Sequence, residues 1–386
     1  MQMISIMSYA SLSAIGHQKQ EVWNHYLSGK HGFSLTKKKD LVAKINPKSM
    51  GLIEQLKASN RKYKHLDPTV LYAISVSNQA FNQTQWDAKD VIGIGIGSSR
   101  GATSSFEKYH KNYLDNKKLS ALSSPTTTLG NISSWVAHEL GCNGPEMSHS
   151  VTCSSGLYSV LNACAWIISG MCEKFVVGGS EAPLTPFTIA QMQALGICAN
   201  DSSKPFPCQS LNLNKKDNSM ILGEGAAVIC LQKGQVNGAL ASINGFGYAN
   251  EVIHHNTSIS SDAKCLQQSM KMALMNKDLS DVDVIITHSP GTMKGDLAEV
   301  EAIKAVFHNN IPAMTTNKWK LGHTLASSGL LSIELALLMI ENQEFIPVPF
   351  IENQKFPKRI NTILINAVGF GGNAVSILIS KSEYHK

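Results

Sequence analysis

Short apolar runs flanked by glycine and polar residues alternate with longer apolar runs along most of the chain. Runs of the first kind predict buried strands, whereas runs of about ten residues or more predict helices. The predicted strands span residues 90–97, 175–178, 223–231, 241–247, 282–287, 362–367 and 374–379. The predicted helices span residues 70–81, 126–140, 157–168, 262–275, 299–307 and 323–340. Strands and helices that alternate in this way are typical of an α/β fold.

The first part of the chain gives a weaker pattern. Residues 1–30 contain short apolar stretches, and the lysine-rich segment that follows to about residue 65 is expected to be mobile. The N-terminus lacks the basic region and apolar run of a signal peptide. No apolar run reaches the length of a membrane-spanning helix, and the longest, 157–168 and 330–340, are expected to be core helices. We therefore expect a cytoplasmic protein without membrane insertion.

Two local matches in the same order predict an internal duplication. Residues 154–159 (SSGLYS) resemble residues 327–332 (SSGLLS), and each stretch opens a predicted core helix. Residues 225–231 (GAAVICL) resemble residues 372–378 (GNAVSIL), and each stretch is a predicted strand led by glycine. Matches that recur in the same order are the mark of a repeated structural unit.

The duplication predicts two similar α/β halves, residues 1–234 and 235–386, with a site at the seam between them. Both predicted helix starts would face this seam. In the alignment of the halves, Ala326 takes the place of Cys153. Only the first half can therefore supply a nucleophilic sulfur at this position.

Cys153 follows a β-like approach, residues 149–152, and precedes small polar residues and a long apolar run. This pattern predicts a strand-to-helix elbow, with the cysteine at or just before the helix N-terminus. Unpaired N–H groups and the helix dipole favour a thiolate there, and a thiolate is a strong nucleophile for acyl groups. Most buried cysteines are only small apolar residues, as we expect for Cys164, Cys172 and Cys230.

Candidate partners for Cys153 lie in the second half. His288 ends a predicted buried strand, and strand ends are where ligands bind in α/β folds. His323 lies near a predicted helix start, where a neutral imidazole can donate a hydrogen bond to a developing oxyanion. The glycine turn 369–372 contains Phe370 and is expected to bring a backbone N–H near that of Cys153, so that the two form an oxyanion hole.

Each of these features also has a purely structural interpretation. A lone histidine is usually a satisfied structural residue, and a glycine turn can be only a tight turn. Lys318 and Lys320, just before His323, can be surface charges. The set as a whole favours catalysis, because a cysteine at an elbow accompanies two histidines at junctions between loops and regular elements.

Composition and charge narrow the class of partner. The chain has 34 Lys and Arg against 28 Asp and Glu, a formal net charge of +6. The basic residues gather early in the chain, at Lys37, Lys38, Lys39, Lys44, Lys57, Arg61, Lys62 and Lys64. Two interpretations stay open: residue by residue they form only a solvated basic face, or together they form a docking surface for an acidic partner. Nucleic acid is poorly supported, because no recognised motif and no interleaved aromatic residues accompany the charge.

The 8 cysteines form no C-x-x-C pair and no cluster with zinc-ligand spacing. We therefore expect free thiols, a reducing compartment and no structural metal.

Six stretches occur as a set, namely 152–156 (TCSSG), 177–182 (VGGSEA) with Thr185 and Pro186, 222–226 (LGEGA), 288–292 (HSPGT) with Gly295 and Asp296, 318–323 (KWKLGH) and 369–372 (GFGG). In their order they resemble the elongating β-ketoacyl-acyl-carrier-protein synthases. The resemblance covers most of the chain, from about residue 90 to about residue 380. It implies a thiolase fold, in which two duplicated α/β halves form a five-layered αβαβα architecture.

The resemblance also implies roles for individual residues. Cys153 is expected to accept the acyl group, and His288 and His323 are expected to hold the malonyl thioester carbonyl as it becomes an enolate. Lys318 falls on the family's active-site lysine, and Phe370 falls on the gating phenylalanine beside the nucleophile.

Further residues are expected to bind substrate, and these are Thr292, Arg100, Met192 and Gly371. The family's substrates bring phosphopantetheine on an acidic acyl carrier protein, so no metal or redox cofactor is expected. The basic balance of the chain suits such a partner. By resemblance we also expect a homodimer, with a heterodimer of related subunits as the alternative.

Several positions depart from the family's usual pattern. Pro290 stands where a threonine that helps to bind pantetheine is usual. Ser332 stands where a glutamate usually pairs with the active-site lysine, and Glu334 would face a different side of the helix. The segment 207–219 is longer than usual and lacks the common Arg-Asp-Gly pattern, and no threonine precedes Asn373. These departures indicate a specialised branch of the family.

Arg100 lies in the loop 97–101, which matches a loop that closes the acyl pocket in the family. A small or apolar residue is common there, and two interpretations of the arginine stay open. Its side chain turns to solvent or to a salt bridge across a dimer. Alternatively, it shortens the pocket or meets a polar or carboxylated acyl end.

Competing classes of protein fit the residues less well. Degradative thiolases use a second cysteine near the C-terminus, and no cysteine follows Cys265 here. Synthases that start chains from coenzyme A esters use Cys-His-Asn, whereas the second motif here has His323. The leading hypothesis is decarboxylative Claisen condensation of an acyl group on Cys153 with a malonyl carrier protein. The alternative is a non-catalytic partner subunit that sets chain length, although such subunits typically lack the nucleophile.

Overall fold

Two five-stranded sheets form the frame of the molecule. The computed structural model describes residues 3–87, 89–252, 260–275 and 277–382. The first sheet has the strand order β1 (Ile4–Leu12), β8 (Gly225–Lys233), β6 (Lys174–Glu181), β4 (Ile92–Gly97) and β5 (Glu146–His149). The second has the order β9 (Ala241–Asn250), β13 (Asn373–Lys381), β12 (Thr362–Gly369), β10 (Val284–Ile286) and β11 (Ala313–Thr315).

The two sheets have the same topology. In the first, β4 runs parallel to β5 and β6, and β8 runs antiparallel to both β6 and β1. In the second, β10 runs parallel to β11 and β12, and β13 runs antiparallel to both β12 and β9. The predicted duplication is therefore confirmed. The proposed boundary after residue 234 falls in the connection between β8 and β9.

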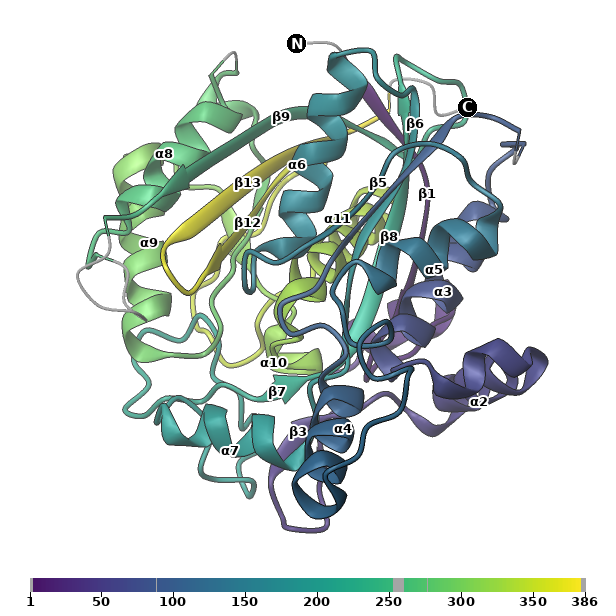
Figure 1. The fold of residues 1–386 in the computed structure, drawn as a ribbon. Helices are drawn as coiled ribbons and strands as arrows, with labels where there is room; N and C mark the ends of the chain where they lie inside the picture. Colours follow the sequence, from purple (N-terminus) through teal and green to yellow (C-terminus); the bar gives the residue numbers. More distant parts are fainter. Residues whose placement is uncertain (1–2, 88, 253–259, 276, 383–386) are drawn as a thin grey trace.

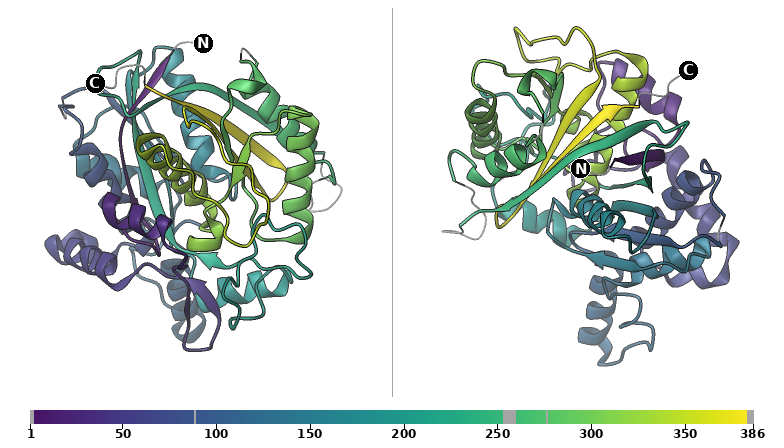
Figure 2. Two further views of the ribbon diagram at one scale, coloured as in Figure 1. Left: turned by 180° about the vertical axis from the view of Figure 1, so that it is seen from behind. Right: turned by 90° about the horizontal axis from the view of Figure 1, so that it is seen from above.

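Helices cover both outer faces of the sheets and fill the space between them (Figures 1 and 2). The first sheet carries α3 (Pro68–Phe81) and α5 (Asn131–Leu140) on its outer face, and the second carries α8 (Lys264–Ala273) and α9 (Met293–Phe307). The inner layer consists of α6 (Ser155–Ile168) and α11 (Ser328–Asn342). The predicted αβαβα layering is thus confirmed, and the two matched SSGL stretches begin the two inner helices.

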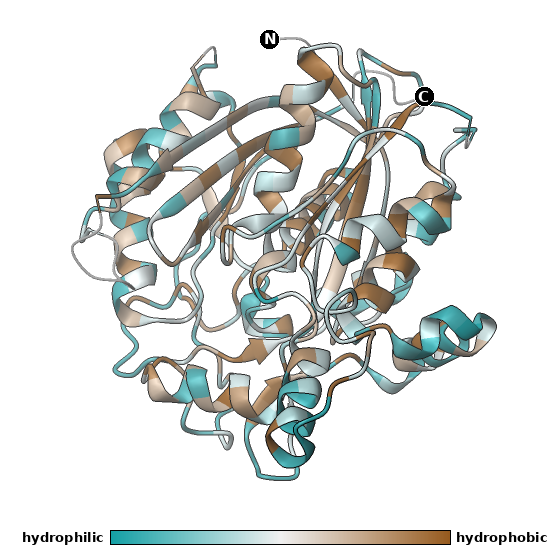
Figure 3. Cartoon of the chain, in the orientation of Figure 1, coloured by the Kyte–Doolittle hydropathy of each residue, from teal (hydrophilic) through white to brown (hydrophobic). Residues whose placement is uncertain are grey.

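Apolar residues follow the strands and the inner helices, whereas the outer helix α2 (Pro47–Ser59) is largely hydrophilic (Figure 3). Every residue of α11 from Ser328 to Ile340 is buried. Among the described residues, one helical stretch, Leu325–Asn342, is long and apolar enough to cross a membrane, which corrects the sequence-based expectation that none is. Within that stretch, 89% of the window lies buried inside the protein, as expected of a core helix.

The lysine-rich segment before residue 65 is ordered, so the expectation of a mobile segment is wrong. It forms β2 (Ser34–Leu35), β3 (Leu41–Ala43), α2 and the 3-10 helix η1 (Arg61–His65), and β2 and β3 join β7 (Leu222–Gly223) in a small sheet. Local capping explains the order. The side chain of Asn46 accepts a hydrogen bond from the Ser49 N–H at the start of α2, and Pro47 occupies the first helical position.

Helix starts differ from the predicted ones where caps or turns intervene. The helix expected from residue 299 begins at Met293, because the Thr292 side chain caps it by accepting from the Gly295 N–H. The helix expected from residue 323 begins at Ser328, after the 3-10 helix η3 (Leu325–Ser327). Four further helices were not predicted, namely α1 (Lys19–Leu27), α4 (Thr103–Asn116), α7 (Pro186–Ala194) and α10 (Lys318–Leu321).

Gly156 gives a test of how closely the inner helices pack. A Cβ added there would lie 2.3 Å from the Ala326 carbonyl oxygen, so we expect Gly156→Ala to lower the free energy of unfolding by about 1–3 kcal/mol. Urea denaturation followed by circular dichroism measures this change.

Gly51 provides the matched control, since it lies inside α2 with nothing within 4 Å of an added Cβ. Gly51→Ala should leave stability unchanged or raise it by about 1 kcal/mol through helix propensity. Equal effects of the two substitutions would contradict the close packing at the seam.

Candidate active site

Cys153 lies on a sharp turn between β5 and α6. The strand ends at His149, and Ser154 is the N-cap of α6. Thr152 adopts a φ of 51°, which is rare for a β-branched residue and marks a strained turn. The Val151 N–H donates to the Ser155 hydroxyl and fixes the turn against the first residue of the helix. The predicted elbow is confirmed, with the cysteine one residue before the cap.

The thiol of Cys153 is buried and is protonated in the resting protein. Burial raises its pKa to about 12, the nearby Glu181 carboxyl adds to this rise, and Lys318 opposes it. The expectation that the helix start makes Cys153 a thiolate is therefore wrong for the resting state, because desolvation outweighs the helix dipole. Attack on an acyl group requires the thiol to lose its proton during the reaction.

His288 and His323 face each other, with ring centroids 5.1 Å apart and ring planes at 87°. His288 follows the end of β10 by two residues, and both side chains are buried. The backbone of His323 is held on both sides, because its N–H donates to the Ile221 carbonyl at 2.7 Å and its own carbonyl accepts from the Gly223 N–H at 3.0 Å. The pair is thus fixed in an edge-to-face arrangement.

Both imidazoles are neutral, which the sequence predicted for His323 alone. Burial lowers the pKa of His323 to about 3, with a further contribution from the Lys318 charge. Burial also lowers the pKa of His288 well below 6.5, followed by the effects of Lys318 and His323. The cause is thus desolvation and a neighbouring cation rather than a helix start, since His323 precedes the helix by several residues.

Lys318, the first residue of α10, is the charge at the centre of the site. It is only 1% exposed, and burial lowers its pKa to about 8, while Glu299 and then Asp296 oppose the shift. Its charge acts on Cys153, His288 and His323 alike. Such coupling requires proximity, so the structure brings together the nucleophile of the first half and the lysine and histidines of the second.

Packing joins the same groups. Cys153 lies in one buried apolar cluster with Leu222 and Leu325, and Leu325 follows His323 by two residues. Leu222 also forms a β-bridge with His323. The apolar wall around the sulfur is therefore continuous with the backbone that carries the second imidazole.

The glycine turn between β12 and β13 abuts the nucleophile. A Cβ added to Gly369 would lie 3.2 Å from the Cys153 nitrogen and would clash with the Thr152 hydroxyl. That hydroxyl donates to the Phe370 carbonyl at 3.4 Å. The Phe370 side chain is 38% exposed, and Gly371 has a φ of 90°, which favours glycine. The turn is thus placed beside Cys153, while its part in an oxyanion hole stays a prediction.

Glu299 was missed by the sequence analysis. Its buried carboxylate accepts from the His288 N–H at 2.8 Å and from the Ser289 N–H at 2.7 Å, and it is the largest influence that raises the pKa of Lys318. Asn366 of β12 also donates to it at 3.3 Å. One feature of the sequence could have revealed its role. Glu299 is an acidic residue on the core-facing side of a predicted helix, and a buried charge needs hydrogen-bonding or charged partners.

The segment 207–219 supplies a second buried charge to the site's surroundings. Lys215 pairs with Asp296 at 2.7 Å, and the two side chains are 3% and 0% exposed. Asp296 also accepts from the Leu211 N–H at 2.9 Å and from the Gly291 N–H at 3.0 Å. The segment 207–219 therefore connects the start of α9 to the loop that follows His288.

Lys320 is buried as well, so neither lysine of this motif is a surface charge. Its ammonium donates to the carbonyls of His25, Ser28 and Lys30, which close the C-terminal end of α1. Burial lowers its pKa to about 7, and it stacks 4.1 Å from the Trp319 ring. These contacts anchor α10, and with it Lys318, to the N-terminal part of the chain.

Comparison with known proteins agrees with this geometry. Residues 1–237 match the family model described as beta-ketoacyl synthase, N-terminal domain, and residues 240–351 match that of the C-terminal domain. The chain belongs to the beta-ketoacyl synthase family. The 3-oxoacyl-[acyl-carrier-protein] synthase 2 of Staphylococcus aureus (strain COL) is 25% identical to it, over 98% of both chains. The enzyme of the same name from Coxiella burnetii is 24% identical over the same shares.

Solved structures show the same fold. A ketosynthase/chain length factor for ishigamide superposes with a TM-score of 0.85 at 18% identity, over 98% of this chain and 99% of that one. A type II polyketide ketosynthase in complex with its acyl-carrier protein gives a TM-score of 0.83 at 19% identity, with the same coverage. At such identities these matches establish the fold alone, which is the thiolase fold expected of a beta-ketoacyl synthase.

Two residues predicted from the beta-ketoacyl synthase pattern to bind substrate are placed as follows. The Thr292 hydroxyl is engaged as the N-cap of α9. The Arg100 guanidinium donates to Gln191 of α7, and its charge acts to lower the pKa of the Glu181 carboxyl. Its backbone N–H donates to Glu181 at 3.2 Å, so the loop that carries it is held next to the carboxyl that acts on Cys153.

The departures from the beta-ketoacyl synthase pattern also find their places. Ser332 donates to the Ser328 carbonyl within α11, and Glu334 faces β1, where it accepts from the Ser11 hydroxyl. As predicted, Glu334 therefore points away from the position of the usual glutamate. Burial raises its pKa to about 7. Among the described residues, no group of three or more His, Cys, Asp or Glu is placed to hold a metal ion.

The role of Lys318 in keeping the imidazoles neutral can be measured. Lys318→Met removes a positive neighbour, so we expect the pKa values of His288 and His323 to rise, although burial should keep both below 6.5. Histidine titration by NMR checks this.

His149 is the internal control, since burial lowers its pKa without a contribution from Lys318. A histidine resonance assigned to His323 that titrates identically in both proteins would contradict the proposed coupling.

Proposed function

We propose that the chain is a condensing β-ketoacyl-acyl-carrier-protein synthase. The observation that carries the proposal is the convergence of Cys153, two neutral imidazoles and Lys318 on one buried site. A sulfur nucleophile beside two neutral N–H donors suits the exchange of thioesters and the formation of an enolate.

In the first step Cys153 takes the acyl group from a carrier thioester. The sulfur attacks the thioester carbonyl, the carbon–sulfur bond to pantetheine breaks, and the cysteine proton passes to the departing pantetheine thiol. The N–H groups of Cys153 and Phe370 are suited to hold the oxyanion, because the glycine turn lies against the nucleophile's backbone. The start of α6 adds its dipole.

In the second step malonyl thioester loses carbon dioxide. The electron pair of the broken carbon–carbon bond moves to form an enolate, whose oxygen accepts hydrogen bonds from the neutral rings of His288 and His323. The enolate carbon then attacks the acyl-cysteine carbonyl, and the carbon–sulfur bond to Cys153 breaks. The sulfur regains a proton, and the product is a β-ketoacyl thioester one two-carbon unit longer.

The carrier in this proposal is an acyl carrier protein, which brings its own phosphopantetheine, so the chain needs no cofactor of its own. The names of the relatives and one solved ketosynthase complex support this partner. Basic residues of the β2–β3 turn and of η1 offer positive charge to an acidic surface, namely Lys37, Lys38, Lys39, Arg61, Lys62 and Lys64. Thr292, Gly371, Met192 and Arg100 are the residues proposed to line the substrate path.

The assembly is proposed to be a dimer, either of two copies or with a related subunit. Exposed apolar side chains of α4 and of the loop after it support such an interface, among them Phe106, Leu114 and Leu119. A cytoplasmic location remains part of the proposal.

A non-catalytic chain-length subunit is the second candidate. It is favoured by the similarity to a ketosynthase/chain length factor and by Pro290 and Ser332 at positions that differ from the family pattern. The nucleophile argues against it, because Cys153 is present in a complete site.

Acylation separates the two candidates. We expect acetyl or longer acyl carrier protein to transfer its acyl group to Cys153 and expect Cys153→Ala to abolish transfer, because Cys153 is the thiol at the start of α6 whose pKa the Lys318 charge lowers. Mass analysis of the Cys153 peptide measures the product. A folded wild-type protein that gains no acyl group would favour the partner-subunit role, and acylation that survives Cys153→Ala would refute the nucleophile.

The imidazole pair can be tested apart from the nucleophile. His288→Ala and His323→Ala should each slow decarboxylative condensation by about 10²–10³-fold, as the loss of an oxyanion donor does, while Cys153 is still acylated. Carbon dioxide release from malonyl carrier protein measures the effect. Loss of acylation and condensation to the same extent would place the histidines in the first step instead.

A further inference from the structure

The segment 207–219 buries a lysine whose charge the proposed mechanism does not use. The Lys215 ammonium lies 2.7 Å from the Asp296 carboxylate, and the two side chains are 3% and 0% exposed. The same ammonium donates to the Asn212 carbonyl at 3.0 Å, whereas the neighbouring Lys216 is exposed. Removing one partner of such a buried pair leaves an uncompensated charge, so the two groups are strongly coupled.

Hydrogen bonds hold this segment against the loop that follows His288. The Ser210 hydroxyl donates to the Ser289 carbonyl at 2.8 Å. Ser219 donates twice to the Gly291 carbonyl, from its N–H at 2.8 Å and from its hydroxyl at 2.9 Å. Gly291 has a φ of 96°, and a Cβ added there would lie 3.1 Å from the Ser219 carbonyl oxygen. The segment and the loop are therefore in contact at backbone distance.

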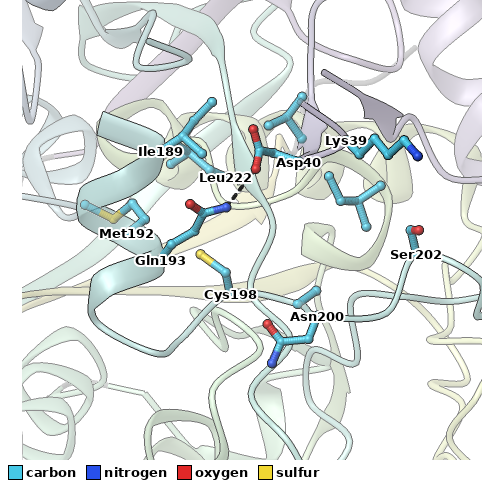
Figure 4. Close-up of a pocket in the computed structure, with 12 residues that line it drawn as sticks. Lys39, Asp40, Ile189, Met192, Gln193, Cys198, Asn200, Ser202 and Leu222 are labelled. Carbon is cyan, nitrogen blue, oxygen red and sulfur yellow. Dashed lines mark hydrogen bonds between the residues drawn. The ribbon is translucent and has the colours of Figure 1, made fainter. Parts of the chain in front are cut away.

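The C-terminal end of the segment is fixed beside a cavity of about 210 Å³ (Figure 4). The Met220 N–H donates to the Ile197 carbonyl at 3.1 Å, and the Met220 carbonyl accepts from the Ala199 N–H at 2.8 Å. Ala199 and Cys198 line the cavity, but its lining contains no residue of the segment 207–219. The polar contacts of the segment are thus directed to the loop after His288 rather than into this cavity.

The Asp296 carboxylate joins the segment, the loop and α9. One of its oxygens accepts from the Gly291 N–H at 3.0 Å, and the other accepts from the Leu211 N–H at 2.9 Å and from Lys215. Asp296 lies in the first turn of α9, where the helix dipole also favours a negative charge. A charged Asp296 is therefore the point at which the loop after His288 is held.

The charge of Lys215 acts on Lys318 through Asp296. Burial raises the pKa of Asp296, and the Lys215 charge is the largest influence that opposes this rise. The Asp296 charge in turn raises the pKa of Lys318 and is second only to Glu299 in doing so. Lys215 therefore favours the charged form of Asp296, which favours the charged form of Lys318.

The other titratable groups that face Lys318 are neutral at pH 7. Two of them are the thiols of Cys208 and Cys153, whose pKa values burial raises to about 11 and about 12. The others are the imidazoles of His288 and His323, whose pKa values burial and the Lys318 charge hold below 6.5. The charges that act on Lys318 in this array therefore come from the two buried carboxylates of α9.

We propose that Lys215, acting through Asp296, is a positioning residue for the decarboxylation of malonyl thioester. Its ammonium holds the Asp296 carboxylate in the charged form that fixes the loop after His288 and supports the charge of Lys318. The inference rests on the proposed function, because it concerns the second step of that reaction. The acylation of Cys153 should depend on it less, since the segment contacts the loop after His288 rather than the elbow.

Kinetics of the two steps test this division. Lys215→Met removes the charge and retains the length of the side chain, and we expect the kcat for carbon dioxide release from malonyl carrier protein to fall by about tenfold. Acylation of Cys153 should stay within about threefold of the wild-type rate. Lys216→Met is the matched control, since it makes the same change at an exposed position of the same segment and should match the wild type. Equal decarboxylation by the two folded variants would overturn the proposal.

The protonation of Lys318 gives a readout that a purely structural role would not change. Without Lys215 the Asp296 carboxyl takes up a proton more readily and loses the charge that raises the pKa of Lys318. Lys318, with a pKa of about 8 in the wild type, should therefore lose its proton at a lower pH in Lys215→Met. NMR titration of protein labelled with ¹³C at the lysine Cε measures this, with the signal assigned by its loss in Lys318→Met. An unchanged titration of Lys318 would overturn the proposal.

A double variant covers the case in which Lys215→Met does not fold. Lys215→Met with Asp296→Asn leaves no unpaired buried charge, and the amide oxygen can still accept from the Leu211 and Gly291 N–H groups. We expect the same lower pKa of Lys318 and the same loss of decarboxylation. Wild-type decarboxylation by this folded variant would overturn the proposal and leave the proposed function intact, whereas a folded wild-type protein that releases no carbon dioxide from malonyl carrier protein would overturn both.

Discussion

The close approach of the two inner helices is the constraint on which the site depends. A Cβ at Gly156 would lie 2.3 Å from the Ala326 carbonyl, and one at Gly329 would lie 2.5 Å from the Leu157 side chain. Glycine on both helices lets the two halves meet at backbone distance. Because Cys153 precedes one helix and His323 precedes the other, this approach also sets the sulfur against the imidazole.

Burial gives the site its electrostatic character. The same desolvation that keeps the histidines neutral and the thiol protonated also acts against the charge of Lys318. Glu299 and Asp296 oppose that effect. A buried cation is stable only with such partners. The acidic residues of α9 thus support the chemistry without belonging to the set that contacts substrate in the proposed mechanism.

Local pattern was enough to predict the repeat and the elbow. These features are encoded by a few neighbouring residues each. They are the matched SSGL stretches, the glycine-led strands and the small residues after Cys153. The positions of His288 and His323 at junctions between loops and regular elements made them candidate partners of Cys153, and the family resemblance then implied their individual roles. The predictions of the repeat and the elbow agree with the structure because they concern only the type and order of helices and strands.

Features that depend on distant partners could not be predicted. The protonation of Cys153 follows from its burial, and the importance of Glu299 follows from hydrogen bonds to a loop eleven residues away. From the sequence, Lys215 resembles an ordinary surface lysine. Only the structure shows that it forms a buried ion pair with Asp296. The order of the lysine-rich segment depends in part on β7, which is more than a hundred residues away along the chain.

The repeat also explains how one chain places different functional groups, a cysteine from one half and histidines from the other, where its two similar halves meet. Sheet order and helix starts are shared by the halves, but Ala326 occupies the place of Cys153. The backbone has kept its twofold likeness, while the side chains at the meeting point have diverged. In the proposed mechanism, this divergence of two copies of one unit lets one lobe hold the electrophile while the other generates the carbanion.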